Sequence, residues 1–205
     1  MGRVFVLGNG ESRLGMDLFG LKLQGKMYGC NALYRNFTPD VLICVDSGMQ
    51  NEVYSSGYAM EHKCYFRTWN NTLEENDEVH IIPENYSGWS AGPIAVRMAL
   101  EDENPDVVYL IGFDLGSPNE LINNVYKGTD NYLSDNALVT PSDNWITQHL
   151  NNFTDYPDTK FYKVNTAPLG TDATCQFVKE WEHCENLQYI EKNSLQLSLD
   201  FGWMM

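Results

Sequence analysis

Positive charge is scarce in this sequence. Its 205 residues include 13 Lys and Arg against 28 Asp and Glu, which gives a formal net charge of −15. A non-specific nucleic-acid surface needs clustered Lys and Arg, so we expect neither DNA nor RNA as a partner. The acidity either reflects a strongly solvated surface alone or requires local donors, or a divalent cation, wherever a phosphate binds.

Long apolar runs and paired cysteine motifs are also lacking. No run approaches the ~20 residues of a membrane span, and no charged-then-apolar leader opens the chain. The 5 cysteines are scattered and have no C-x-x-C spacing, which supports neither a disulfide framework nor a zinc site. We therefore expect a cytoplasmic protein with reduced thiols and no membrane span. The length fits a single domain over residues 1–205.

Short apolar runs bounded by turn residues are frequent, as in buried strands of a parallel sheet. They predict strands at Val4–Leu7, Met27–Cys30, Val41–Val45, Cys64–Phe66, Val79–Ile82, Val107–Ile111 and Lys160–Val164. Apolar residues at helical spacing predict helices at Pro93–Glu101, Trp145–Phe153 and Ala173–His183. Strands alternating with helices predict a Rossmann-like α/β fold, with a mainly parallel sheet and helices on both faces.

Two stretches differ from this pattern. Residues 117–144 are rich in Asn, Gly, Ser and Asp, and we expect a polar lid there, because ligands of open α/β sheets bind where such strands end. Residues 194–203 alternate strictly between apolar and polar side chains, which predicts a strand with one apolar face. Such a strand either covers the core or meets a second copy of the chain in a homo-oligomer, and we expect it to cover the core.

The first predicted strand runs directly into a glycine turn. Gly8 and Gly10 permit positive φ and close approach of the backbone, and Ser12 is placed to cap a helix that begins near Leu14. A strand, a glycine turn and a helix N-terminus together form an anion site, which predicts a nucleotide ligand. The dinucleotide fingerprint is absent, since Arg13 stands where its third glycine belongs.

Polar residues follow several other predicted strands. Asn31 is suited to a base or ribose contact, and Asp46 and Asp114 are suited to Mg²⁺ or ribose hydroxyls, although each of these residues also suits a helix cap or a turn. The turn from Ser87 to Pro93 enters the best-defined helix and offers a second anion site. In a parallel sheet these strand ends share one edge, so we expect a common crevice.

The lid and the helix after it supply further candidates. Lys127 is the only cation between Arg97 and Lys160, which makes it the expected phosphate donor of the lid. His149 follows the lid within a predicted helix, where it is either a general base or an ordinary surface histidine. No H-E-x-x-H motif, nucleophile elbow or Walker A lysine occurs.

The order of these motifs resembles a known superfamily over about the first 115 residues. The relevant segments are Gly8-Asn9-Gly10-x-Ser12, Cys30-Asn31, Pro39 to Asp46, Ser90-Ala91-Gly92-x-x-Ala95 and Val108 to Asp114. This succession is similar to that of the bacterial sialyltransferases of glycosyltransferase family 42. It also resembles the related 6-hydroxymethylpterin diphosphokinase-like family.

Each resemblance implies a set of site residues. The sialyltransferase likeness implies metal-free transfer, with a cytidine nucleotide donor held by Asn9, Gly10, Asn31 and the Ser90–Gly92 turn. It also implies that Tyr126 and Tyr132 are lid tyrosines near the phosphate. The chain departs from that family at Ala91, where a serine is usual, and in lacking a histidine between the lid and the next helix. The diphosphokinase likeness implies ATP and Mg²⁺, with Asp46 and Asp114 as metal ligands.

The sequence therefore predicts a transferase, first of all a glycosyltransferase that uses a nucleotide sugar, CMP-linked in the sialyltransferase case. Its acceptor would be a small molecule or a glycan. Two alternatives stay open at this stage. One is Mg²⁺-dependent transfer of diphosphate from ATP to a pterin-like small alcohol, and the other is a nucleotide-binding or interaction protein without catalysis.

Overall fold

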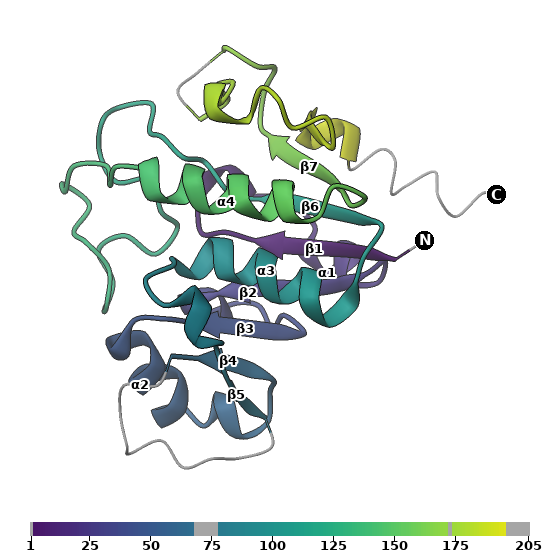
Figure 1. The fold of residues 1–205 in the computed structure, drawn as a ribbon. Coiled ribbons are helices and arrows are strands. Elements are labelled where there is room, and N and C mark those ends of the chain that lie inside the picture. Colours follow the sequence, from purple (N-terminus) through teal and green to yellow (C-terminus); the bar gives the residue numbers. More distant parts are fainter. Residues whose placement is uncertain (1, 68–77, 172–173, 196–205) are drawn as a thin grey trace.

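The protein is built on one parallel β-sheet. The computed structural model describes residues 2–67, 78–171 and 174–195. Its strands are β1 (Arg3–Leu7), β2 (Lys26–Cys30), β3 (Val41–Cys44), β4 (Cys64–Phe66), β5 (Val79–Ile81), β6 (Val107–Ile111), β7 (Lys160–Asn165) and β8 (Leu187–Glu191). They form an 8-stranded sheet in the order β5-β4-β3-β2-β1-β6-β7-β8, and every pairing is parallel (Figure 1). The predicted strands up to Lys160–Val164 are all confirmed, to within a residue or two at their ends.

The strand order reverses at the centre of the sheet. From β1 the chain winds outward through β2, β3, β4 and β5, and then returns to pair β6 with the other side of β1. Ligands of such sheets bind outside the carboxyl ends of the strands at this reversal. The crevice between the ends of β1 and β6 is therefore the expected site.

Helices pack on both faces of the sheet, as predicted. Their bounds are α1 (Leu18–Lys22), α2 (Ser47–Ser55), α3 (Ala91–Glu103) and α4 (Asp143–Asp155). One face carries α3 and α4, which lie side by side in Figure 1 and share a core with Val6 and Phe161. The opposite face carries α1 and α2, which pack around Phe5 and Leu42. None of the helices in the described ranges has the length and apolar character needed to cross a bilayer.

The prediction of a helix that begins near Leu14 is wrong. A single 3₁₀ turn, η1 (Glu11–Arg13), follows the glycine turn, and Gly15 then takes a φ of +73°. The α-helix begins only at Leu18, because Asp17 caps it by accepting a hydrogen bond from the Gly20 N–H at 2.9 Å. Ser12 is thus not a helix cap.

The two C-terminal predictions also need correction. Of the helix predicted at Ala173–His183, the described residues 174–183 form only one 3₁₀ turn, η5 (Lys179–Trp181). Trp181 is buried, but Phe177 is 53% exposed, so the stripe of Phe177, Val178 and Trp181 is not a single buried face. The strand predicted at 194–203 lies mostly outside the described residues, and its first two residues are helical. The edge strand here is β8, which the sequence reading missed.

Candidate functional site

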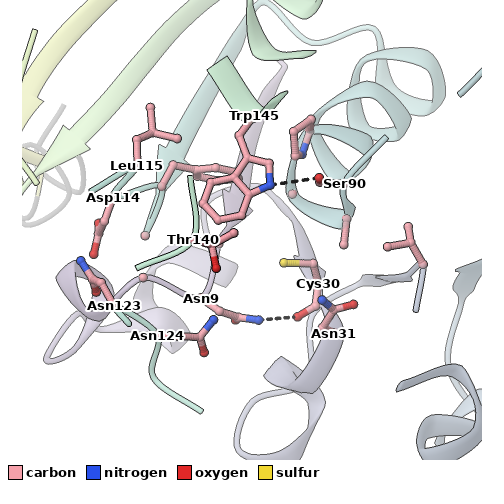
Figure 2. Close-up of a pocket in the computed structure, with 18 of the residues that line it drawn as sticks. Asn9, Cys30, Asn31, Ser90, Asp114, Leu115, Asn123, Asn124, Thr140 and Trp145 are labelled. Atoms are coloured by element: carbon pink, nitrogen blue, oxygen red, sulfur yellow. Dashed lines mark hydrogen bonds between the residues drawn. The ribbon is translucent and has the colours of Figure 1, made fainter. Parts of the chain in front are cut away.

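A cavity of about 490 Å³ opens at the carboxyl edge of the sheet (Figure 2). It lies at the β1/β6 reversal, and its walls come from the segments that follow β1, β2, β3, β4 and β6 and from the starts of α3 and α4. The predicted site residues that line it are Gly8, Asn9, Gly10, Asn31, Asp46, Ser90, Gly92, Asp114, Tyr132 and His149. Ser12, Tyr126 and Lys127 are not part of the lining.

The glycine turn is packed against the protein itself. Gly10 has a φ of −64°, and neither Gly8 nor Gly10 has positive φ, so the predicted positive φ is wrong, whereas the predicted close approach of the backbone is present. A Cβ on Gly10 would lie 2.5 Å from the Asp114 carboxylate and 2.7 Å from the Gly112 carbonyl oxygen. The glycines are therefore required because the turn after β6 approaches the turn after β1 closely.

The N–H groups of Gly8, Gly10, Glu11 and Ser12 already have acceptors within the chain. The Gly10 N–H donates to the Gly112 carbonyl at 2.9 Å, and the Glu11 N–H donates to Asn123 Oδ1 at 2.9 Å. Ser12 gives both its N–H, at 2.9 Å, and its hydroxyl to the buried carboxylate of Asp114. A carboxylate thus occupies the position in which the sequence reading expected a phosphate.

This arrangement also bears on the predicted magnesium site. Both oxygens of Asp114 accept hydrogen bonds from Ser12, and Asp46 is the other carboxylate in the lining. Among the described residues, no group of three or more His, Cys, Asp and Glu side chains has a metal-binding arrangement. Because Mg²⁺ in proteins often binds only one or two carboxylates together with phosphate oxygens and water, Asp46 and Asp114 stay predicted ligands, which a nucleotide would have to complete.

Two asparagines of the cavity lining have buried side-chain oxygens without a hydrogen-bond partner. Asn9 is buried and its Nδ2 donates to the Cys30 carbonyl at 3.1 Å, whereas its Oδ1 has no partner. Asn31 has a φ of +53°, a strained conformation that asparagine tolerates better than most residues, and its Oδ1 also lacks a partner. A bound group that donates hydrogen bonds would satisfy both oxygens.

The start of α3 forms another wall. Ser90 is the N-cap residue, but its hydroxyl accepts from Trp145 Nε1 at 3.0 Å and its N–H donates to Gln148 Oε1 at 2.9 Å (Figure 2). Both partners belong to α4, which therefore holds this end of α3 in place. Helix geometry leaves the next two N–H groups, those of Ala91 and Gly92, without intrahelical acceptors, and both residues line the cavity.

Arg67 is the cation that the sequence reading missed. It follows β4 and is the one Lys or Arg among the described residues that line the cavity. Its Nη2 donates to the Trp89 carbonyl at 2.6 Å, which places the guanidinium close to the start of α3, and its buried Nε has no partner. The available signal was its position at a strand carboxyl end, the same position that singled out Asn31 and Asp46.

His149 is completely buried, so the surface-histidine alternative is wrong. It lies on the α4 face that also carries Trp145, and its ring centroid is 4.9 Å from that of Phe113, with the two rings nearly perpendicular. Burial and the positive charge of Lys163 lower the pKa of His149 to about 3. A neutral imidazole of such low basicity is better suited to hydrogen bonding than to general base catalysis at neutral pH.

The segment predicted to be a lid is a polar stretch that docks on the glycine turn. Residues 117–142 contain no helix or strand apart from an isolated bridge between Leu121 and Leu138. The Val125 N–H donates to the Asn9 carbonyl at 2.8 Å, and the Tyr132 hydroxyl accepts from Asn9 Nδ2 at 3.2 Å. In this conformation the segment forms part of the cavity wall, through residues such as Asn123 and Tyr132.

Two predicted lid donors face away from the cavity. The Tyr126 hydroxyl accepts from Arg13 Nη2 at 2.8 Å and donates to Asn36 Oδ1 at 2.7 Å. Lys127 pairs with Glu11 at 2.7 Å. The expectation that Tyr126 and Lys127 meet a phosphate is therefore not supported by this conformation, in which their polar atoms are used within the chain.

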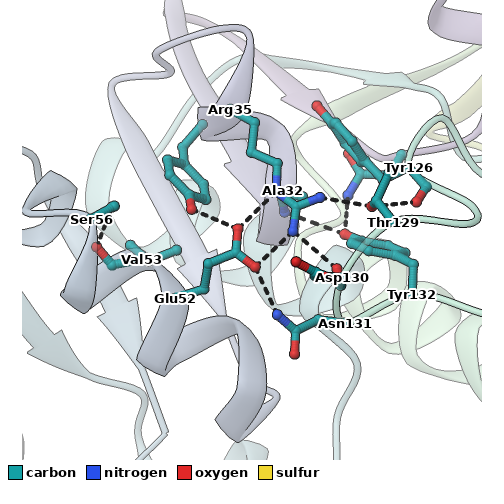
Figure 3. A network of polar contacts seen from close by, with 12 residues as sticks. Ala32, Arg35, Glu52, Val53, Ser56, Tyr126, Thr129, Asp130, Asn131 and Tyr132 are labelled. Atoms are coloured by element: carbon teal, nitrogen blue, oxygen red, sulfur yellow. Dashed lines mark hydrogen bonds and ion pairs between the residues drawn. The ribbon is translucent and has the colours of Figure 1, made fainter.

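An arginine and a glutamate tie the segment to the body of the protein (Figure 3). Arg35 donates to both carboxylate oxygens of Glu52 at 2.7 Å each, and also to Thr129 Oγ1 at 2.7 Å and the Asp130 carbonyl at 3.0 Å. Glu52 in turn accepts from Asn131 Nδ2 at 2.7 Å. We call the pair Arg35 and Glu52, with residues 129–131, the latch.

Replacing Glu52 with glutamine is expected to weaken the latch. The hydrogen bonds from Arg35 lower the pKa of Glu52 to about 2, so its stabilising effect is present above the ordinary value of 4.5 and is lost as the pH falls toward 2. We expect Glu52→Gln to lower the free energy of unfolding by about 1–2 kcal/mol at pH 7. The difference from the wild type should shrink between pH 4.5 and pH 3 in urea titrations.

Glu61→Gln is the matched control, because Glu61 is exposed and forms no part of the latch. Its free energy of unfolding should stay within ~0.5 kcal/mol of the wild type at every pH. Hydrogen exchange of residues 126–132 should quicken in Glu52→Gln alone. Equal exchange in both variants would mean that the latch does not hold the segment.

Comparison with known proteins gives no relative for this chain: no family model, no curated protein and no solved structure matches it. The resemblance in motif order therefore stays a prediction. Function has to be argued from the cavity itself.

Proposed function

We propose that the protein is a glycosyltransferase that binds a nucleotide sugar in the cavity at the β1/β6 reversal. One observation carries the proposal: Asn9, Asn31 and Arg67, each of which has a buried polar atom without a partner, line the same cavity as the N–H groups at the start of α3. A cavity of about 490 Å³ falls in the range of small-molecule sites. Its polar groups are of two kinds: hydrogen-bond donors, to which we assign the phosphate, and hydrogen-bond acceptors, to which we assign the nucleoside.

The phosphate is assigned to the start of α3. Helix N-termini attract anions through free N–H groups and the helix dipole, and the guanidinium of Arg67 adds a full positive charge beside the Trp89 carbonyl. The glycine turn is not the phosphate site in this proposal, since Asp114 and Asn123 already accept its N–H groups.

The nucleoside is assigned to the two asparagines. The free atoms of Asn9 and Asn31 are amide oxygens, which accept hydrogen bonds and repel phosphate. A ribose hydroxyl or a base amino group donates to such oxygens. This assignment keeps Asn9 and Asn31 as nucleotide contacts while it moves the phosphate to a different wall.

The reaction needs a base, and Asp46 is the proposed one. Its carboxylate lines the cavity, is exposed and does not cap α2. The acceptor hydroxyl oxygen bonds to the anomeric carbon while the bond from that carbon to the phosphate oxygen breaks, and Asp46 takes the hydroxyl proton. Arg67 and the N–H groups of Ala91 and Gly92 stabilise the charge that the leaving nucleotide retains.

A nucleotide panel tests the proposal. CMP, UDP, GDP and ATP, each with Mg²⁺ and with a chelator, are added in a thermal-shift assay, followed by titration calorimetry. A nucleotide at 100 times its Kd should stabilise the protein by about 2.7 kcal/mol, and we expect this for at least one of CMP, UDP and GDP in chelator. The same nucleotide should inhibit transfer of its linked sugar.

Other outcomes of the panel would contradict the proposal. Binding of ATP alone, and only with Mg²⁺, would support diphosphate transfer instead. No shift with any of the four would support a protein that retains the fold without nucleotide binding.

We further propose a cytoplasmic location. All five cysteines are free thiols, the state in which reducing compartments keep cysteines.

A further inference from the structure

A fully buried imidazole in the cavity lining has no hydrogen-bond partner. His149 is 0% exposed, and neither ring nitrogen has a hydrogen-bond partner in the described part of the chain. Aromatic rings surround it: Phe113 edge-on at 4.9 Å, Trp181 at 6.0 Å and Phe153 at 6.1 Å between ring centroids. A buried polar group in such surroundings costs stability, which points to a ligand that satisfies it.

The chemistry of this imidazole restricts what it binds. Its pKa is lowered to about 3, so at neutral pH it is uncharged and offers one N–H donor and one nitrogen acceptor. A hydroxyl group both donates and accepts, whereas a carboxylate only accepts. An uncharged imidazole also gives a carboxylate no compensating charge in a buried position.

The charges of the cavity point the same way. Arg67 is the one cation among the described lining residues, and it stands near the start of α3, where the phosphate is assigned. The other charged lining residues are the carboxylates Asp46 and Asp114. An acidic sugar would carry its carboxylate into a space that already holds two others, with no second cation among the described lining residues.

The walls near His149 suit a sugar ring. Trp89, Phe113 and Trp145 all line the cavity, and Trp145 lies one turn before His149 on α4. The C–H face of a pyranose ring packs on aromatic rings, while its hydroxyl groups need hydrogen-bonding partners at the edge. The cavity offers both kinds of surface together.

We infer that the group carried by the nucleotide is an uncharged, hydroxyl-bearing sugar, and that His149 binds one of its hydroxyl groups. This inference rests on the proposed function and narrows it. The inferred neutral sugar differs from the acidic sugar that sialyltransferases transfer. His149 is here a specificity-determining residue and takes no proton from the acceptor.

Matched pairs of nucleotide sugars test the charge preference. Calorimetry compares UDP, UDP-glucose and UDP-glucuronic acid, in which the two sugars differ only in the carboxylate, and GDP, GDP-mannose and GDP-mannuronic acid, which are matched in the same way. A third set, CMP, CDP-glucose and CMP-N-acetylneuraminic acid, also differs in phosphate number and sugar size. In the set that binds, we expect the neutral sugar nucleotide to bind at least tenfold more tightly than the acidic one. Equal or tighter binding of the acidic sugar overturns the inference but leaves the proposed function standing. No binding in any of the three sets overturns both.

His149→Phe tests the role of the imidazole. It should weaken binding of the neutral sugar nucleotide about tenfold and leave the free nucleotide within twofold, because one hydrogen bond to the sugar is lost. The melting temperature of the ligand-free variant should stay equal or rise, since two unpartnered buried atoms disappear.

The control is His62→Phe, which keeps the ring contact with Tyr58 and lies outside the cavity lining. It should change neither affinity. If His149→Phe loses equal affinity for the free and the sugar-linked nucleotide, His149 lies against the nucleoside and the inference is overturned. Unchanged affinity for both would overturn it as well.

Discussion

Gly8→Ala is expected to destabilise the ligand-free protein by about 2–3 kcal/mol, the cost of forcing an extra methyl group into a packed site. Its Cβ would lie closer than 3.0 Å to the Gly112 carbonyl oxygen, a backbone atom that has no rotamer by which to move away. Gly112 is itself fixed, with a φ of +75°. The loss should appear in urea denaturation without any nucleotide present.

Gly2→Ala is the control for this prediction. The nearest atom to its Cβ would be 3.6 Å away, an ordinary contact, so its free energy of unfolding should stay within ~0.5 kcal/mol of the wild type. If glycine at position 8 instead served close approach of a phosphate, Gly8→Ala would unfold like the wild type and lose only nucleotide affinity. That result would return the phosphate to the glycine turn.

The glycine turn shows how far the sequence reading could go. An apolar run followed by glycines correctly predicted a strand and a tight turn at one edge of a parallel sheet. What the glycines approach is decided by a segment about one hundred residues farther along, the Gly112 to Asp114 turn. Close approach to a ligand and close approach to another backbone leave the same local signature.

The strands were predicted better than the helices, for a physical reason. A strand buried on both faces needs an uninterrupted apolar run, which is visible locally, as in Val107–Ile111. The segment 174–183 has apolar residues at helical spacing, yet Trp181 is fixed by donating a hydrogen bond to the Ile146 carbonyl at 2.9 Å. Edge strand β8 has only an intermittent apolar pattern, since it is covered incompletely.

The candidate site was predicted through topology more than through residue type. Residues placed at strand carboxyl ends, such as Asn31 and Asp46, line the cavity because parallel strands end at one edge. Of the lid residues, Lys127 was chosen by its charge, whereas Tyr126 and Tyr132 came from the family resemblance. Only Tyr132 lines the cavity, because Tyr126 is held by Arg13 and Lys127 by Glu11. Local sequence does not show which side of a long polar segment faces inward.

Arg67 is the cation that we assign to the phosphate. Arg67→Met is expected to weaken nucleotide binding by about 10- to 100-fold, because a charge-assisted hydrogen bond to phosphate contributes about 1.5–3 kcal/mol. Methionine retains part of the aliphatic stem while it removes the only positive charge among the described lining residues. Titration calorimetry with the nucleotide that responds in the panel gives the measurement.

Lys127→Met is the matched variant, since it removes one positive charge from the same acidic protein. Lys127 pairs with Glu11 at 2.7 Å and does not line the cavity, so affinity should change less than twofold. If long-range attraction alone matters, the two variants should lose the same amount of nucleotide affinity. If Arg67 contacts the phosphate directly, only Arg67→Met should bind the nucleotide weakly. Repeating both titrations at high salt distinguishes these causes. Salt screening would abolish a loss of affinity caused by long-range attraction, but it would leave most of a loss caused by a buried contact. Loss of affinity in Lys127→Met alone would place the phosphate under the lid and refute its assignment to the start of α3.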